Sequence, residues 1–213
     1  MNRRTLLHLA LLSPLLAPLA ARAQGTPQPS PQDAADLARI EAYLNGIRTL
    51  KAHFLQVAPD GAMSQGTAWL DRPGRMRFEY DPPAPFLLVA AHGNLVFEDR
   101  SIEQISNVPL SLTPLGILLA DHVSLSGDVR VTGFRRLPGQ LEVTLVRSGS
   151  PQDGSLTLLF TDSPLALRQW TVVDAQRRET RVTLYNVEQG VSLDPKLFQF
   201  DDPRSFQSGG SGG

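Results

Sequence analysis

The chain contains no cysteine. Disulfide bonds, zinc sites built from cysteine and catalysis by a thiol are therefore excluded. A bacterial lipoprotein carries its acyl chains on a cysteine directly after its signal peptide. This chain is therefore not expected to be a lipoprotein itself.

Charge of one sign is not in excess. The chain has 20 basic and 21 acidic residues. Three of the basic residues, Arg3, Arg4 and Arg22, lie at the start of the chain, and removing them leaves 17 against 21, a net charge of −4. Such a balance, without a dense run of like charge, gives no electrostatic footprint for nucleic acid or anionic lipid. We therefore expect no nucleic-acid partner.

A long apolar run occurs only near the start of the chain. Arg3-Arg4 precedes apolar residues 6–20, and residues 21–23 read Ala-Arg-Ala, a small-x-small cleavage pattern, so residues 1–23 are predicted to be a signal peptide. A transmembrane anchor is the alternative, but two prolines interrupt a run that is short of about 20 apolar residues. The paired arginines leave the twin-arginine export route open beside the general one. We expect a soluble, exported protein.

Catalytic motifs are also missing. The histidines after residue 23, His53, His92 and His122, are not spaced as zinc ligands on a helix, and there is no glycine-rich phosphate loop. Ser211 lies in a Gly-Gly-Ser-Gly-Gly tail that matches a hydrolase nucleophile by letters, but that chemistry needs a strained strand-to-helix turn. We predict no catalytic residue, metal site or cofactor, and no enzyme. An exported hydrolase stays open as an alternative because active sites assemble from distant residues.

What the sequence does contain is one helix followed by many short strands. Residues 24–30 are predicted to be a disordered leader. A helix follows over 31–46, with Ser30 as its cap and Pro31 in its first position. Residues 31–207 are predicted to form one domain, and 208–213 a flexible Gly/Ser tail.

The strand predictions rest on short apolar segments between turn signals. They are Leu50–Ala58, Gln65–Asp71, Arg75–Tyr80, Pro85–Ala91, Leu95–Glu98, Ile102–Ser106, Val123–Ser126, Val129–Arg135, Leu141–Arg147, Ser155–Thr161, Leu167–Val173 and Glu179–Glu188. Regularly spaced short strands favour an antiparallel barrel or sandwich.

One segment, Pro109 to Ala120, breaks the strand pattern and is almost wholly apolar. Thr113 can cap, and Pro114 can open, a short helix there. A helix that is apolar on nearly all faces must be covered. It is either a plug that fills the core or a lid over an apolar pocket.

The segment from Trp69 to Pro83 is the most informative one. Met76, Phe78 and Tyr80 alternate with polar residues, so they share one face of a strand. An Arg72-Pro73-Gly74 corner precedes that strand. The apolar face fits either plain core packing or the wall of an apolar cavity.

These segments together resemble the LolA family of periplasmic lipoprotein carriers. The matching pieces are Ala52–Gln56, Gly66–Tyr80 with Pro83, Glu103-Gln104, Thr113-Pro114-Leu115, the hairpin around Asp174–Arg181, and Asp194–Phe200. The resemblance implies a mainly β fold with helices. Its core is an incomplete antiparallel β-barrel, a half-barrel, covered by the N-terminal helix and a short apolar lid helix.

The resemblance also implies a function. A member of this family binds the acyl chains of lipoproteins released by an ATP-driven inner-membrane complex and delivers them to the outer membrane, where a receptor is present in some bacteria. We expect this chain to act as a monomer. Arg72 matches the family's rim arginine, which holds the lid as a latch and is expected to bury little. Lipid binding is expected at six residues: Met76, Phe78, Tyr80, Leu112, Leu115 and Leu118.

Three alternatives remain. Arg72 could be an ordinary turn arginine, and the apolar residues plain core. The half-barrel could also serve as a binding or sensor module for another apolar ligand.

Overall fold

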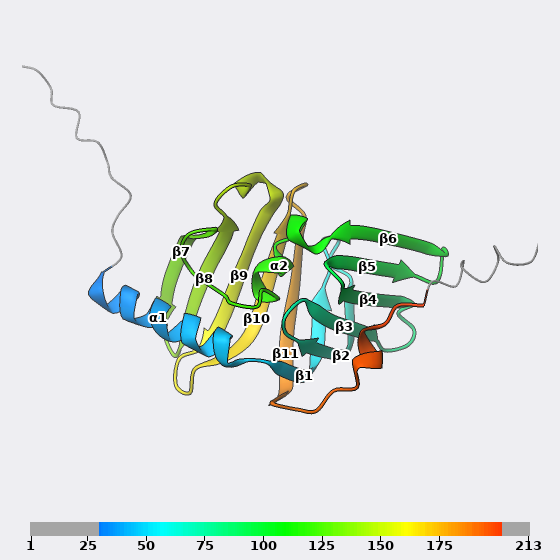
Figure 1. The fold of residues 1–213 in the computed structure, drawn as a ribbon, viewed down its shortest axis with the longest axis horizontal. Helices are drawn as coiled ribbons and strands as arrows, with labels where there is room; N and C mark the ends of the chain where they lie inside the picture. Colours follow the sequence, from blue (N-terminus) through cyan, green and yellow to red (C-terminus); the bar gives the residue numbers. More distant parts are fainter. Residues whose placement is uncertain (1–29, 202–213) are drawn as a thin grey trace, which may run out of the picture.

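One antiparallel sheet of eleven strands dominates the computed structural model, which describes residues 30–201 (Figure 1). The strands are β1 (Thr49–Val57), β2 (Met63–Asp71), β3 (Arg75–Tyr80), β4 (Phe86–Ala91), β5 (Asn94–Asp99), β6 (Gln104–Pro109), β7 (Val129–Leu137), β8 (Gln140–Arg147), β9 (Gly154–Thr161), β10 (Ala166–Asp174) and β11 (Glu179–Gln189). The predicted signal peptide and the predicted Gly/Ser tail lie outside the described residues, as does most of the predicted leader.

Within residues 30–201, two α-helices and three 3₁₀ turns accompany the sheet. They are α1 (Pro31–Gly46), η1 (Leu110–Leu112), α2 (Leu115–Leu118), η2 (Pro151–Asp153) and η3 (Pro195–Phe198). The start of α1 is fixed by a capping box, in which the Ser30 hydroxyl accepts from the Asp33 amide and the Asp33 carboxylate accepts from the Ser30 amide. The predicted helix and its cap are therefore confirmed.

The strand order places the first strand, β1, beside the last strand, β11, at the centre of the sheet. From β1 the strands run outward to β6, and from β7 they return to β11, which pairs with β1. The segment between residues 110 and 128 crosses from one outer strand, β6, to the other, β7. Since β6 and β7 do not pair, the sheet curves without closing (Figure 1). The predicted incomplete antiparallel barrel with helices is confirmed.

The core lies on the concave side of this sheet. Along β3, the residues that point inward are buried and the alternate ones are more exposed, as strand geometry requires. Helix α1 contributes Ile40 and Leu44 to the same core, and Tyr43 meets the edge of Phe160 with ring centroids 5.8 Å apart. Helix α1 therefore covers the half of the sheet that contains β9 (Figure 1).

An ion-pair network fastens α1 to β7. Arg136 donates to Asp36 at 2.5 Å, and Arg39 donates to the other oxygen of the same carboxylate at 2.7 Å. The hydrogen bond from Arg136 is the main reason why the pKa of Asp36 is lowered. This carboxylate is therefore ionised and paired at neutral pH.

The strand predicted at Val123–Ser126 is wrong. Both backbone polar groups of Val123 bond to the Asn45 side-chain amide, at 2.8 and 2.9 Å, and the Leu125 amide donates to the Glu41 carboxylate at 2.8 Å. Side chains of α1 satisfy this backbone, so it does not need a neighbouring strand. The strand predicted at Ile102–Ser106 is displaced to Gln104–Pro109, because a turn precedes it.

Candidate functional site

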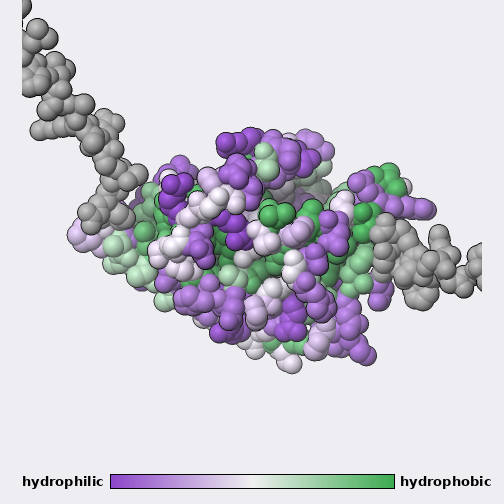
Figure 2. Space-filling model, turned by 45° about the horizontal axis from the view of Figure 1, so that its top comes forward, coloured by the Kyte–Doolittle hydropathy of each residue, from purple (hydrophilic) through white to green (hydrophobic). Residues whose placement is uncertain are grey.

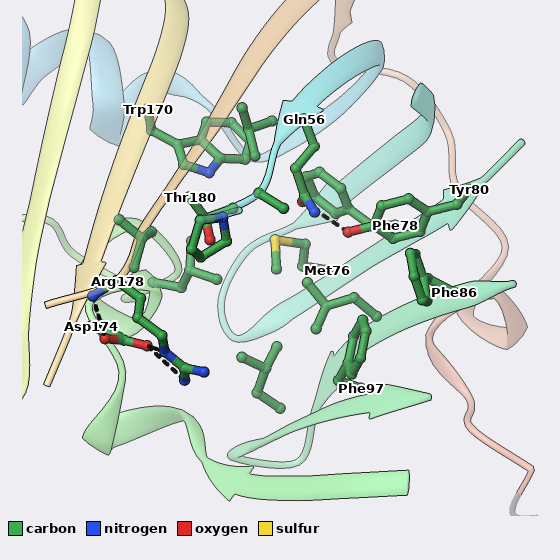
Figure 3. A pocket seen from close by; sticks show the side chains of 17 residues that line it. Gln56, Met76, Phe78, Tyr80, Phe86, Phe97, Trp170, Asp174, Arg178 and Thr180 are labelled. Carbon is green, nitrogen blue, oxygen red and sulfur yellow. Dashed lines mark hydrogen bonds and ion pairs between the residues drawn. The ribbon is translucent and has the colours of Figure 1, made fainter. Parts of the chain in front are cut away.

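A cavity of about 490 Å³ opens on the concave side of the sheet (Figure 3). Its wall is mostly apolar and consists of Gln56, Ala58, Pro59, Met76, Phe78, Tyr80, Phe86, Leu88, Leu95, Phe97, Leu115, Trp170, Val172, Asp174, Arg178, Thr180 and Val182. Figure 2 shows apolar side chains gathered in a hollow between hydrophilic rims on one face of the molecule. The cavity therefore has an apolar interior and a polar border.

Cross-strand register explains why these side chains meet. Phe78 on β3 pairs with Leu88 on β4, and Leu88 pairs with Phe97 on β5. Paired residues in neighbouring antiparallel strands project from the same face. The three side chains therefore form one apolar row across the wall of the cavity.

Aromatic rings link the floor of the cavity to its wall. Phe78 contacts Trp170 edge-on at a centroid distance of 5.9 Å, and both rings are buried. Nearer the opening, the centroid of the Phe86 ring lies 5.6 Å from that of Tyr80 and 5.6 Å from that of Phe97. Phe86 and Phe97 are half-buried. The half-buried rings are the apolar surface that a ligand can still cover.

Two of the polar side chains in the wall satisfy each other. The Tyr80 hydroxyl donates to the Gln56 side-chain oxygen at 2.8 Å. Burial raises the pKa of Tyr80 to about 12. The phenol therefore stays neutral and acts here as a packed, hydrogen-bonded ring.

Two charged side chains lie in the same wall. Arg178 donates from Nε to Asp174 Oδ2 at 2.9 Å, and its Nη2 is also 2.9 Å from that oxygen. Burial alone would raise the pKa of Asp174, but hydrogen bonds from the backbone and side chain of Arg178 lower it. The pair is therefore charged on both sides at neutral pH.

The predicted lid is the segment that contains η1 and α2. Leu115 reaches the cavity, whereas Ile117, Leu118 and Leu119 are buried in the core. The predicted cap is wrong, because the Thr113 hydroxyl donates backward to the Leu110 carbonyl at 2.9 Å and α2 has no side-chain cap. A 3₁₀ turn therefore precedes a helix of a single turn.

Arg72 binds the C-terminal end of this lid. Its guanidinium donates to the Ala120 carbonyl from Nε at 3.0 Å and from Nη2 at 2.7 Å. It also donates from Nη1 to the carbonyls of Leu44 and Ile47, where α1 ends. One side chain thus satisfies carbonyls at the ends of two helical segments, where such groups lack partners.

The expectation that Arg72 buries little is wrong. The residue is only 5% exposed, and burial lowers its pKa, with the nearby positive charge of Arg48 adding to the effect. The corner before β3 points the guanidinium into the gap between α1 and the lid instead of along the rim.

A second arginine, Arg147, contacts the opposite end of the lid. Arg147 Nη2 donates to the Thr113 carbonyl at 3.4 Å, and Arg147 Nε is buried with no hydrogen-bond partner among the described residues. A Cβ atom on Gly116 would collide with this guanidinium and with the Leu110 carbonyl. The hydrogen bonds that arginine side chains donate to the lid are therefore shorter and more numerous at Arg72 than at Arg147.

The structure brings four of the six predicted lipid-binding residues to the cavity: Met76, Phe78, Tyr80 and Leu115. Leu112 does not line it and is 60% exposed, and Leu118 is 3% exposed in the core. Of the four residues of α2, Leu115 is the one that lines the cavity, and Leu118 packs into the core instead. These placements correct the prediction for Leu112 and Leu118.

Sequence reasoning missed most of the other residues of the wall. Trp170 and Val172 come from β10, and the half-buried Phe86, Leu88, Leu95 and Phe97 come from β4 and β5. All of them lie in segments that the sequence predicted as strands. Apolar alternation in those segments was the available signal, but it did not reveal which strands face each other.

Residues 30–201 contain no group of three or more His, Cys, Asp or Glu side chains placed to hold a metal ion. Within the same range, no helix is both long and apolar enough to cross a membrane.

Taken together, the open sheet, the covering helix and the lid define a half-barrel protein with a lidded apolar cavity. A family model described as "Outer membrane lipoprotein carrier protein LolA" matches residues 45–201. The chain belongs to the LolA family.

Two sequence relatives align with most of the length of this chain. An outer-membrane lipoprotein carrier protein from Methylococcus capsulatus is 29% identical over 205 residues, which cover 92% of this chain and 93% of the relative. One from Pseudomonas paraeruginosa is 29% identical over 202 residues, which cover 87% and 92%. A solved LolA superfamily protein from Nitrosomonas europaea is 12% identical with a TM-score of 0.42, covering 77% of this chain and 97% of that one.

Proposed function

We propose that this protein is a periplasmic carrier that binds the acyl chains of lipoproteins released from the inner membrane and delivers them to the outer membrane. The main observation in support is the apolar cavity beneath a lid, in a chain of the LolA family. The relatives that match most of its length bear the name of outer-membrane lipoprotein carrier proteins.

The cavity has the physical properties that such a carrier needs. Each CH₂ group of an acyl chain gains about 0.8 kcal/mol when it leaves water, so a soluble carrier must surround the chain rather than offer it a flat patch. The volume of about 490 Å³ lies within the usual range of ligand sites, roughly 300–1,000 Å³. Half-buried rings such as Phe86 and Phe97 give a surface that binds without the tight packing that would prevent release.

The proposal includes a route and partners. The signal peptide would direct the chain to the periplasm, and the protein would act there as a monomer and not as an enzyme. It would receive acylated lipoproteins from an ATP-driven inner-membrane release complex. It would pass them to an outer-membrane receptor in bacteria that have one.

The experiment uses two matched charge substitutions on neighbouring positions of β5. Phe97 faces the cavity and Val96 faces the opposite side of the sheet, and both are half-buried. A charge placed in an apolar pocket costs several kcal/mol unless it is paired or reaches water. We expect Phe97→Glu to weaken binding of a synthetic dipalmitoylated lipopeptide by at least tenfold, and Val96→Glu to leave it within about twofold of the parent.

Binding is measured by displacement of the neutral probe N-phenyl-1-naphthylamine, and circular dichroism verifies that each variant is folded. A folded Phe97→Glu variant that binds the lipopeptide like the parent would remove this wall from the site. Mass spectrometry of ligands that co-purify from the periplasm then tests the cargo class. Recovery of another apolar molecule in place of acylated lipoproteins would favour a binding module for that molecule.

A further inference from the structure

The cavity wall contains one charged pair. Of its 17 residues, only Asp174 and Arg178 bear a charge at neutral pH, and the other side chains are apolar or uncharged. Both come from the hairpin that joins β10 to β11, and Figure 3 shows their side chains bonded to each other at one side of the cavity. A ligand whose chains fill the apolar part would therefore place its polar head beside this pair.

The hairpin itself holds the pair in position. Asp174 Oδ1 accepts from the backbone amides of Gln176 and Arg178, at 2.9 Å each, and its second oxygen binds the Arg178 guanidinium. Arg178 Nη1 has no hydrogen-bond partner within residues 30–201, and the Arg178 side chain is 65% exposed. The guanidinium is thus oriented in advance and still has donors to offer.

The charges decide which head group fits. Free Nη1 donors can satisfy a carbonyl oxygen, which would be costly to bury without a hydrogen bond. Asp174 already compensates the charge of the guanidinium, and its carboxylate would repel an added anion. The pair therefore favours a neutral ester or amide carbonyl over a phosphate or a free carboxylate.

We infer that Asp174 and Arg178 form a head-group subsite that lets the cavity accept diacylated ligands with a neutral ester head and reject anionic phospholipids with the same chains. This inference rests on the proposed function. A carrier that loads at a membrane meets phospholipids in large excess, and the apolar wall cannot distinguish acyl chains that are identical. Discrimination between the two kinds of ligand must therefore come from the polar head, and Asp174 and Arg178 are the charged residues of the wall that can contact it.

The test compares two ligands that share their acyl chains. A dipalmitoylglyceryl-cysteine lipopeptide and dipalmitoylphosphatidylglycerol each compete with N-phenyl-1-naphthylamine for the mature protein at low ionic strength. We expect the parent to prefer the lipopeptide. Asp174→Asn, which keeps an oxygen for the two turn amides, should tighten phosphatidylglycerol binding about tenfold. Arg178→Gln should weaken lipopeptide binding severalfold.

A matched control is available one residue after the hairpin. Glu179 pairs with Arg181 at 2.7 Å and does not line the cavity, so Glu179→Gln removes the same charge from the same region without touching the subsite. The ratio of lipopeptide affinity to phosphatidylglycerol affinity should stay at the parent value in this variant.

Added salt should reduce the parent's preference for the lipopeptide, since screening weakens repulsion between exposed charges.

Two outcomes would overturn the inference, and they can be told apart. If the parent binds the lipopeptide but the ratio is the same in Asp174→Asn, the subsite is wrong and the proposed function stands. If neither diacylated ligand displaces the probe from the parent, the proposed function fails and the subsite fails with it.

Discussion

Replacing Arg72 with alanine tests how the lid is fastened. The substitution removes the donors for the carbonyls of Leu44, Ile47 and Ala120 in a region that is almost completely buried. A buried acceptor that loses its partner costs about 1–3 kcal/mol. Water can enter the space left by the side chain and satisfy part of this loss, so we expect the free energy of unfolding to fall by about 2–4 kcal/mol.

The assay combines urea unfolding with hydrogen exchange of individual segments. Arg72→Ala should lower the urea midpoint and should also speed exchange in residues 115–120, because Ala120 belongs to the lid. The control is Arg48→Ala, which breaks an exposed ion pair of 3.1 Å with Asp121. Exposed pairs contribute about 0–1 kcal/mol, so this variant should stay near the parent in both measurements.

Two results would refute the reasoning. An Arg72→Ala variant within about 0.5 kcal/mol of the parent would mean that the buried carbonyls find other donors at little cost. A clear loss of stability with unchanged exchange in the lid would mean that Arg72 supports only the end of α1. In that case the residue is structural and is not a latch.

Two further predictions concern stability. Gly66→Ala should lower the free energy of unfolding by about 1–3 kcal/mol, measured by urea, because its Cβ would collide with the Glu79 backbone carbonyl on β3. The control Gly133→Ala meets only ordinary contacts and should stay within about 0.5 kcal/mol of the parent. Equal costs for the two variants would refute the steric argument. The pKa of Asp36 is lower in the folded state than its unfolded value of about 3.9, so the unfolded chain binds more protons at acidic pH. The stabilisation that Asp36 contributes is therefore present above about pH 4 and is lost as the pH falls through the folded pKa. Urea titrations at a series of acidic pH values should therefore show a smaller acid-induced loss of stability in Asp36→Asn, and identical pH profiles would refute the assignment.

The fold was largely predictable from local signals. Ser30 and Pro31 set the start of α1, and turn residues between apolar segments set most strands, because these features depend on neighbours in sequence. The strand predicted at Val123–Ser126 failed for a non-local reason. Its backbone bonds to Asn45 and Glu41, more than 70 residues earlier in the chain, and no local pattern encodes that contact.

The site was predictable only in part, for a related reason. Alternation showed that Met76, Phe78 and Tyr80 share a face, and the structure places that face at the cavity. The contribution of Trp170 depends on which strands lie opposite each other across the curved sheet, which is a property of the whole topology. The burial of Arg72 likewise depends on where α1 ends relative to the lid.

The pairing of β1 with β11 at the centre of the sheet has a consequence for the order of folding. Residues 49–109 and 129–189 can each build a meander from neighbouring strands, but Val57 must meet Arg181 to join them. Closing so long a loop costs roughly 3 kcal/mol more conformational entropy than closing a five-residue hairpin, by the logarithmic dependence on loop length. This central seam is therefore expected to form late and slowly, since non-local pairing limits folding rates.

The cavity depends on the same seam. Its wall takes Met76 and Phe97 from the first meander and Trp170 and Arg178 from the second. The cavity is therefore complete only after the last strand has been added to the sheet. A ligand that touches both meanders holds them together, and it stabilises the pairing of β1 with β11 that we expect to form last.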